Sequence, residues 1–181
     1  MTAPELLELR KKLKNLDSKE NLQLFTTLYK SWCHNPVSTF TLCLLTQSYE
    51  HASNLLQIFG MELEITVNFL VQVDKLVQLL ESPVFTYLRL QLLEPEKHPF
   101  LLKFLYGVLM LLPQSSAFAT LRNRLNSVSG FNNNFSGNNL LTNVGKDEKS
   151  KRKVEIVKWS ELANHFSNIQ ALHDSSRREG I

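Results

Sequence analysis

Glycine and cysteine are scarce in this chain and its histidines are scattered, which argues against several kinds of catalytic site. Four of the six glycines lie at or beyond Gly130, so no glycine-rich loop is present to cradle phosphate groups. The five histidines form neither a His-Glu-x-x-His motif nor a close cluster with cysteine. Cys33 and Cys43 fit no zinc or redox spacing and are expected to be small buried side chains. We therefore predict a protein that is not an enzyme and holds no metal or cofactor.

Long apolar runs and a strong excess of one charge are also missing. The most apolar segment, residues 100–112, contains 13 residues and includes Lys103, whereas a membrane span needs about 20 apolar residues. Residues 1–20 are charged throughout and do not resemble a secretory signal. The net charge is only +3, and residues 21–127 hold seven basic and seven acidic side chains. A nucleic-acid reader usually shows a strong basic face, so nucleic acid is not an expected partner.

What the chain does contain is a series of helical patterns marked by proline. Pro36, Pro83 and Pro99 each stand where a helix can begin, because proline is tolerated in the first helical turn and breaks helix interiors. Asp17 is expected to cap the second helix and Gly60 to end the fourth. Apolar side chains recur at steps of three and four residues in 4–16, 20–32, 36–45, 49–59, 65–81, 85–93, 100–112 and 118–128.

These patterns predict an all-α fold. Helices of this length joined by short turns favour an α-solenoid of antiparallel helix pairs, with a compact helical bundle as the structural alternative. We expect the helical, partner-binding domain to cover residues 1–128. An Asn-rich and then basic linker is expected at 129–157, an amphipathic helix at 158–173 and a disordered tail at 174–181. The helix carries Trp159, Leu162, Phe166 and Ile169 at helical spacing, so it must dock onto the main domain or onto a partner.

Two sets of residues are candidates for binding, and each has a simpler interpretation. Aromatic side chains of the helical domain are of the kind enriched at protein interfaces, although core packing is the favoured explanation for any one of them. A basic run in the linker suits anionic lipid or nuclear import, although a solvated linker explains it too. The candidate partner contacts are Trp32, Phe40, Tyr49, Tyr87, Phe100, Phe104 and Tyr106. The candidate lipid contacts are Lys149, Lys151, Arg152 and Lys153.

Four segments together carry a resemblance to a known family. They are SWCHNPVSTFTLCLL at 31–45, YEHA at 49–52, LLESPVFTYLRLQL at 79–92 and KHPFL at 97–101. In these segments the chain closely resembles the carboxy-terminal region of the ArPIKfyve family, the scaffold of the PIKfyve lipid kinase complex. The resemblance covers roughly residues 6–125, and a weaker similarity is present at 161–162 and 165–166.

The resemblance implies a scaffold built from HEAT-like repeats. Such a scaffold self-associates, as a pentamer, and binds a Sac-domain phosphatase that removes phosphatidylinositol 3,5-bisphosphate, the product of PIKfyve. It also implies a cytoplasmic location, peripheral on endosomal and on vacuolar or lysosomal membranes. The family's long amino-terminal solenoid is not part of the resemblance, so PIKfyve kinase is expected to bind the full assembly rather than this chain alone. The Asn-rich segment 131–139 departs from the family pattern.

A hypothesis from another class is a peripheral membrane module. The basic linker and the helix from Trp159 to Ile169 would then bind anionic lipid directly.

Overall fold

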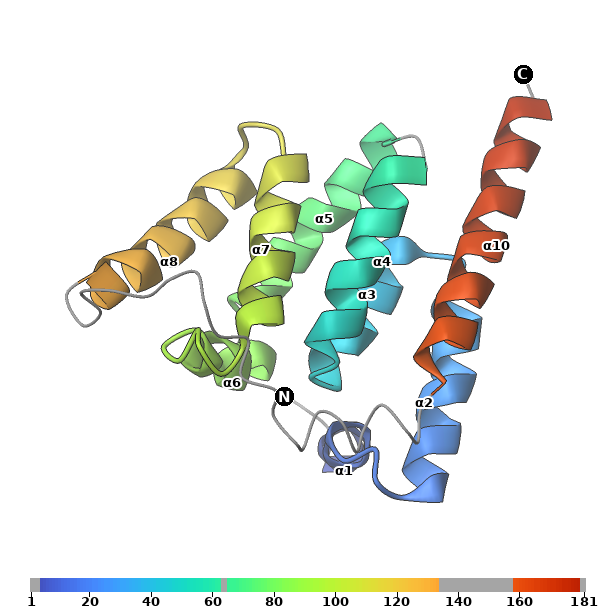
Figure 1. Ribbon diagram of the computed structural model, residues 1–181, viewed down its shortest axis with the longest axis horizontal. Helices are drawn as coiled ribbons and strands as arrows, with labels where there is room; N and C mark the ends of the chain where they lie inside the picture. Colours follow the sequence, from blue (N-terminus) through green and yellow to red (C-terminus); the bar gives the residue numbers. More distant parts are fainter. Residues whose placement is uncertain (1–3, 63–64, 134–157, 180–181) are drawn as a thin grey trace. The chain divides into compact units, whose positions relative to one another are not determined.

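The regular elements of the computed structural model are all helices in the residues that it describes, which are 4–62, 65–133 and 158–179 (Figure 1). The predicted all-α class is confirmed for these residues. Contacts divide the chain into two compact units. Unit 1 combines Met1–Ile65 with Asp147–Ile181, and unit 2 is Thr66–Lys146. Stacking into a solenoid and the expected domain boundaries stay predictions.

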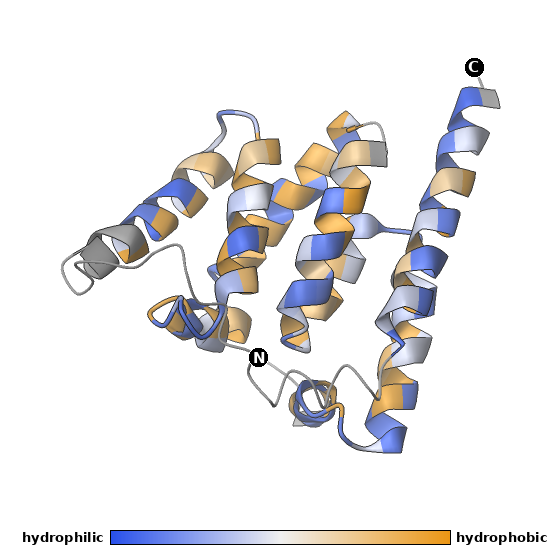
Figure 2. Ribbon diagram, in the orientation of Figure 1, coloured by the Kyte–Doolittle hydropathy of each residue, from blue (hydrophilic) through white to orange (hydrophobic). Residues whose placement is uncertain are grey.

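Unit 1 brings the last helix of the chain together with the first four. Its elements are α1 (Pro4–Lys14), α2 (Lys19–Trp32), α3 (Pro36–Leu45), α4 (Tyr49–Glu62) and α10 (Trp159–Glu179). Helix α2 contacts α1 and α3, α3 contacts α4, and α10 contacts both α2 and α4. Figure 2 shows hydrophilic and hydrophobic residues on α10, as expected of a helix with one buried face. The largest fully buried side chains of this unit are Leu16, Phe25, Tyr29, Phe40, Leu42, Leu44, Leu55 and Phe166.

Of two predicted helix starts in unit 1, the structure confirms that of α3 and differs at the cap of α2. Helix α3 begins at Pro36 as predicted, and Asn35 caps it, because the Asn35 side chain accepts a hydrogen bond from the Ser38 amide at 3.1 Å. The cap of α2 is Ser18 rather than Asp17, and its side chain makes no capping hydrogen bond. The Asp17 amide instead donates to the Asn15 side chain at 3.1 Å.

Gly60 does not end α4, contrary to the prediction. The helix continues through Gly60 to Glu62, and a Cβ atom at residue 60 would meet nothing within 4 Å. A single glycine costs a helix only about 1 kcal/mol, so it ends a helix only where another constraint turns the chain.

The turn between α3 and α4 contains an unusual backbone conformation. Gln47 has a φ of 58°, in the left-handed region that favours glycine. Its amide donates to the Leu44 carbonyl at 3.3 Å, and the Ser48 amide donates to the Cys43 carbonyl at 2.9 Å. This pair of hydrogen bonds defines a Schellman motif, in which the left-handed position is most often glycine.

We expect Gln47→Gly to raise the free energy of unfolding of unit 1 by about 0.5–1 kcal/mol, because glycine adopts the left-handed conformation without steric cost. The matched control is Gln23→Gly, at an exposed position inside α2. There the same replacement should lower stability by about 1 kcal/mol. Urea unfolding of both variants measures whether each change raises or lowers the free energy of unfolding. Destabilisation by Gln47→Gly would contradict this account of the turn.

Unit 2 is built around α5. Its elements are α5 (Val67–Leu80), the 3₁₀ helix η1 (Pro83–Phe85), α6 (Thr86–Gln91), α7 (Pro99–Leu111) and α8 (Ser116–Asn133). Helix α5 contacts η1, α6 and α8, and α7 contacts α8. The buried apolar side chains of α5 are Phe69, Val73, Leu76, Val77 and Leu80. The helical pattern was predicted to begin at residue 65, but Ile65 precedes the helix and is exposed.

Polar side chains fix the turns of unit 2. Arg89 donates hydrogen bonds to the carbonyl oxygens of Leu80 and Ser82. These hydrogen bonds hold the turn before Pro83. The Arg124 guanidinium of α8 contacts the Glu81 carboxylate with both Nε and Nη2. Two-point contact of this kind gives geometric specificity as well as attraction. These charged side chains therefore fix the end of α5 against α8.

Two helices extend past their expected ends. Helix α8 continues to Asn133 rather than ending at residue 128, because glycine and asparagine weaken a helix without necessarily terminating it. Helix α10 continues to Glu179 rather than 173. Its last turns are supported by Asp174, which pairs with Arg177 at 3.6 Å and with Arg178 at 2.7 Å.

Candidate partner-binding surfaces

Helix α10 is anchored in unit 1 by two aromatic side chains, Trp159 and Phe166. The Trp159 ring centroid lies 5.7 Å from that of Phe25 and 4.7 Å from that of His51. Further along, the fully buried Phe166 lies 6.3 Å from Phe40. The stripe predicted for this helix therefore packs onto its own chain.

A buried hydrogen bond lies beneath the first of these anchors. The Tyr29 hydroxyl and His51 Nε2 are 2.8 Å apart, and only 6% of His51 is exposed. Burial lowers the pKa of His51 to about 4, and burial raises the pKa of Tyr29 well above its ordinary value. The imidazole against Trp159 is therefore neutral at neutral pH.

The carboxy-terminal half of α10 is held by polar contacts to the end of α2. The Gln170 side chain donates to the Cys33 carbonyl, and both groups are buried. Close by, His34 Nδ1 and His173 Nε2 are 2.9 Å apart, so one imidazole donates to the other. Aromatic packing at one end and hydrogen bonding at the other fix α10 along α2.

Both cysteines are buried and free, as predicted. Burial raises the pKa of the Cys33 thiol to about 12, and burial also raises the pKa of Cys43. Both thiols therefore stay protonated, which makes them poor nucleophiles and poor metal ligands. Among the described residues, no three His, Cys, Asp or Glu side chains gather as metal ligands would.

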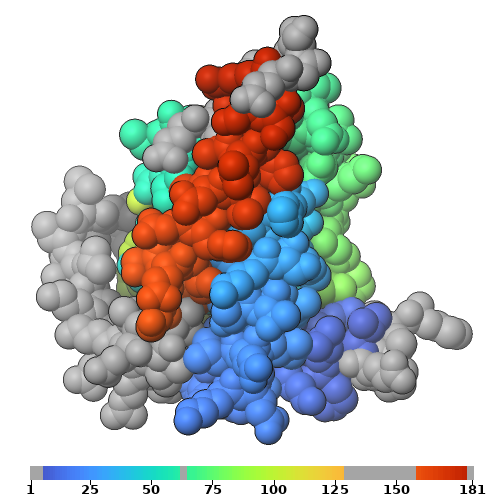
Figure 3. All heavy atoms as spheres, turned by 90° about the vertical axis from the view of Figure 1, so that its right-hand side faces the viewer, coloured from blue at the N-terminus to red at the C-terminus, as the bar shows by residue number. Residues whose placement is uncertain are grey.

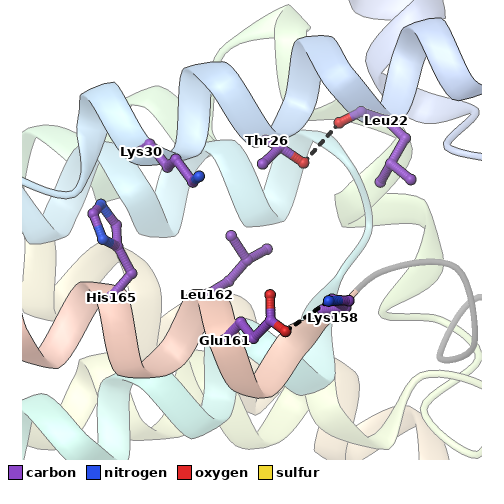
Figure 4. A pocket seen from close by; sticks show the side chains of 7 residues that line it. All are labelled: Leu22, Thr26, Lys30, Lys158, Glu161, Leu162 and His165. Carbon is purple, nitrogen blue, oxygen red and sulfur yellow. Dashed lines mark hydrogen bonds and ion pairs between the residues drawn. The ribbon is translucent and has the colours of Figure 1, made fainter.

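A hollow of about 370 Å³ lies between α2 and α10, and we call it the α2–α10 groove. Figure 3 shows the two helices lying against each other on this face of unit 1. Side chains from both helices point into the space between them (Figure 4). They are Leu22, Thr26 and Lys30 from α2, and Lys158, Glu161, Leu162 and His165 from the start of α10.

The charges of the groove are only partly paired. Lys158 Nζ lies 2.8 Å from a Glu161 carboxylate oxygen, which leaves that pair neutral. Lys30 is exposed and has no acidic partner among the described residues. The Thr26 hydroxyl donates to the Leu22 carbonyl at 2.8 Å. The groove therefore has an apolar floor and a net positive charge on its α2 side.

Unit 2 carries the second candidate surface, which consists of exposed apolar side chains. Met110 on α7 is 76% exposed, and Tyr106, one turn earlier, is half-buried. Leu90 and Leu93 are exposed on α6 and just after it. Large exposed side chains of this kind are candidates for contact with a partner. In the residues that the structure describes, nothing covers most of the Met110 side chain.

A comparison with protein families decides the identity of the chain. Residues 1–128 match the family described as vacuolar protein 14 C-terminal Fig4p binding. The chain belongs to this family. The match confirms the resemblance to the ArPIKfyve family, and the Vac14 region so defined contains α1 to α7 and most of α8.

Curated relatives from three organisms agree with the Vac14 assignment. The VAC14 homolog of Schizosaccharomyces pombe is 53% identical over 181 residues, which are 99% of this chain and 21% of the relative. The VAC14 homolog of Arabidopsis thaliana is 43% identical over 200 residues, covering 100% of this chain and 26% of the relative. The vacuole morphology and inheritance protein 14 of Saccharomyces cerevisiae is 42% identical over 184 residues, covering 93% and 20%. The chain thus spans about a fifth to a quarter of the length of these relatives.

Comparison with solved structures gave no significant match.

The aromatic residues predicted to contact a partner fall into two groups in this Vac14 region. Phe40, Tyr49 and Phe104 are buried in the cores of their units, so they offer a partner little or no exposed area in this conformation. Half-buried positions are occupied by Trp32, Tyr87, Phe100 and Tyr106. Contact with a partner stays a prediction for these four residues.

The predicted lipid contacts Lys149, Lys151, Arg152 and Lys153 lie outside the described residues. The apolar face of α10, which the membrane hypothesis also requires, is buried against α2 and α4. No described helix has both the length and the apolar character needed to span a bilayer.

Sequence reasoning missed the residues of the α2–α10 groove. Thr26 and Lys30 lie off the apolar stripe of α2, so the pattern assigns them to a solvated face. Nothing local indicates that a helix more than a hundred residues later packs beside them. Met110 did have a signal, because the segment around it is apolar on every side.

Proposed function

We propose that this chain is a non-catalytic binding module for a Sac-domain phosphoinositide phosphatase of the Fig4p kind. The observation that supports the proposal is the family match over residues 1–128, whose description names Fig4p binding. The module would hold the phosphatase within a larger scaffold that regulates synthesis and turnover of phosphatidylinositol 3,5-bisphosphate. The chain's part in that scaffold is recognition rather than chemistry.

The exposed apolar side chains of unit 2 are suited to supply the binding energy. A few large apolar and aromatic side chains carry most of the affinity in protein interfaces. Met110 and Leu90 are exposed, and Tyr87, Phe100 and Tyr106 are half-buried. Burial raises the pKa of Tyr87, so its hydroxyl stays neutral and suits a dry interface.

The proposal extends to the larger assembly. Self-association is supported by the exposed Met110 side chain on α7, the helix labelled in Figure 1. Engagement of PIKfyve belongs to the full-length scaffold, of which this chain corresponds to about a fifth to a quarter. A location on endosomal and vacuolar membranes is supported by the name of the yeast relative, vacuole morphology and inheritance protein 14.

Binding to the phosphatase tests the proposal directly. The immobilised 181-residue chain is expected to capture the purified full-length phosphatase, and Met110→Asp is expected to weaken the affinity about tenfold because it places a charge in an apolar interface. Leu172→Asp is the matched control, since Leu172 is 64% exposed on α10. Light scattering on the same samples measures self-association. A folded chain that captures no phosphatase would refute the proposed function.

A further inference from the structure

We propose that the α2–α10 groove receives an extended segment of the phosphatase in which a large apolar side chain stands next to a carboxylate. The inference rests on the proposed function and adds the chemistry of the segment that is recognised. It assigns the charged part of the interface to unit 1.

The floor of the groove fits an apolar side chain. Leu162 is buried and Leu22 is half-buried, and both point into the hollow (Figure 4). The hollow of about 370 Å³ lies within the range of about 300–1,000 Å³ that is usual for ligand sites. A protein segment gains affinity there mainly by removing the exposed part of Leu22 from water, with the buried Leu162 beneath it.

The charge of the groove selects a carboxylate beside that apolar group. Glu161 is already neutralised by Lys158, so the positive charge that remains is that of Lys30. His165 faces the groove from the opposite helix and offers an imidazole nitrogen. An acidic side chain would complete an ion pair with Lys30, whereas a basic segment would be repelled by Lys30. Complementary charge of this kind steers association and fixes the register of a partner.

A peptide fits these features better than a lipid headgroup does. The groove joins one unpaired positive charge to an apolar floor and places the Glu161 carboxylate at its edge. A phosphorylated headgroup would bring several negative charges to the single charge of Lys30 and would leave Leu22 without an apolar partner. A protein segment supplies one carboxylate and one apolar side chain together.

The test compares the affinity of four forms of the 181-residue chain for the full-length phosphatase. Lys30→Glu reverses the charge of the groove and should weaken binding about tenfold. Thr26→Phe fills the hollow and should weaken binding to a similar degree. The matched control, Lys19→Glu, makes the same charge change at an exposed position at the start of α2, outside the groove, and should bind like the wild type. Circular dichroism confirms that every variant is folded.

Each outcome decides the inference. If both groove variants bind like the wild type, the groove is not the site, while the proposed function stands. If Lys19→Glu weakens binding as much as Lys30→Glu does, the effect is general electrostatics and the inference is refuted. If Lys30→Glu reduces binding to phosphatidylserine-containing vesicles and leaves phosphatase affinity unchanged, the groove serves lipid. A wild-type chain that does not bind the phosphatase refutes the proposed function as well.

Discussion

Phe166→Ala is expected to lower the free energy of unfolding of unit 1 by about 3–5 kcal/mol, the cost of removing a large aromatic side chain from a core. Phe166 has no exposed surface and packs against Phe40 between α10 and the rest of the unit. The loss includes both the apolar burial of the ring and the cavity that it leaves. Because an isolated helix is marginal in water, α10 should detach before the rest of the unit unfolds.

Urea unfolding monitored by tryptophan fluorescence measures this loss, since Trp159 reports on α10 through its contacts with Phe25 and His51. The control is Leu172→Ala on the same helix, where the side chain is 64% exposed and the cost should stay within about 0.5 kcal/mol. Similar midpoints for Phe166→Ala and the wild type would show that α10 is not held in unit 1 as described.

The second large effect is loss of stability in mild acid. The pKa of His51 is about 4 in the folded protein and 6.5 in an exposed imidazole, because burial disfavours the charged ring. Between pH 4 and 6.5 the unfolded chain binds a proton that the folded chain excludes. Stability is therefore fully present above pH 6.5 and falls as the pH drops through this window. At pH 5 the loss relative to pH 7 amounts to about 2 kcal/mol from His51 alone.

A His51→Gln variant isolates this contribution, because glutamine keeps a polar group beside the Tyr29 hydroxyl and does not titrate. The variant should be less stable than the wild type at pH 7 and should lose about 2 kcal/mol less between pH 7 and pH 5. The control is His165→Gln in the α2–α10 groove, which leaves His51 in place and should keep the acid dependence of the wild type. Equal pH dependence in His51→Gln and the wild type would contradict the assignment.

The sequence predicted the features of this fold that depend on near neighbours. The helical pattern over residues 20–32 indicated that α2 has an inner face, which Phe25 and Tyr29 occupy, and Pro36 marked the start of α3, because both signals act within a few residues. Gln47 carried no such signal, since glycine and asparagine are the residues expected at a left-handed position. Its conformation depends on the turn that packing of α3 on α4 imposes.

The candidate sites depend even more than the fold on contacts between residues that are distant in the sequence. The sequence alone does not distinguish an aromatic residue in a core from one at an interface. Only the packed structure shows that Phe40 lies in a core. The α2–α10 groove joins side chains more than a hundred residues apart, as Lys30 and His165 are. No local sequence pattern predicts that α2 and α10 line the same groove. The family resemblance identified the partner class, and the geometry of the units was needed to place the surfaces.

The order of the two units along the chain also governs how the protein is made. Unit 2 lies between the two segments of unit 1, so a ribosome synthesises α5 to α8 before it reaches α10. At about 5–20 residues per second, the roughly one hundred residues between Glu62 and Trp159 take on the order of 5–20 s to translate. Throughout that interval Phe25 and His51 lack the indole ring that later covers them. The nascent chain therefore exposes an apolar face for seconds, and a chaperone that shields this face would act between the completion of unit 2 and the closing of unit 1.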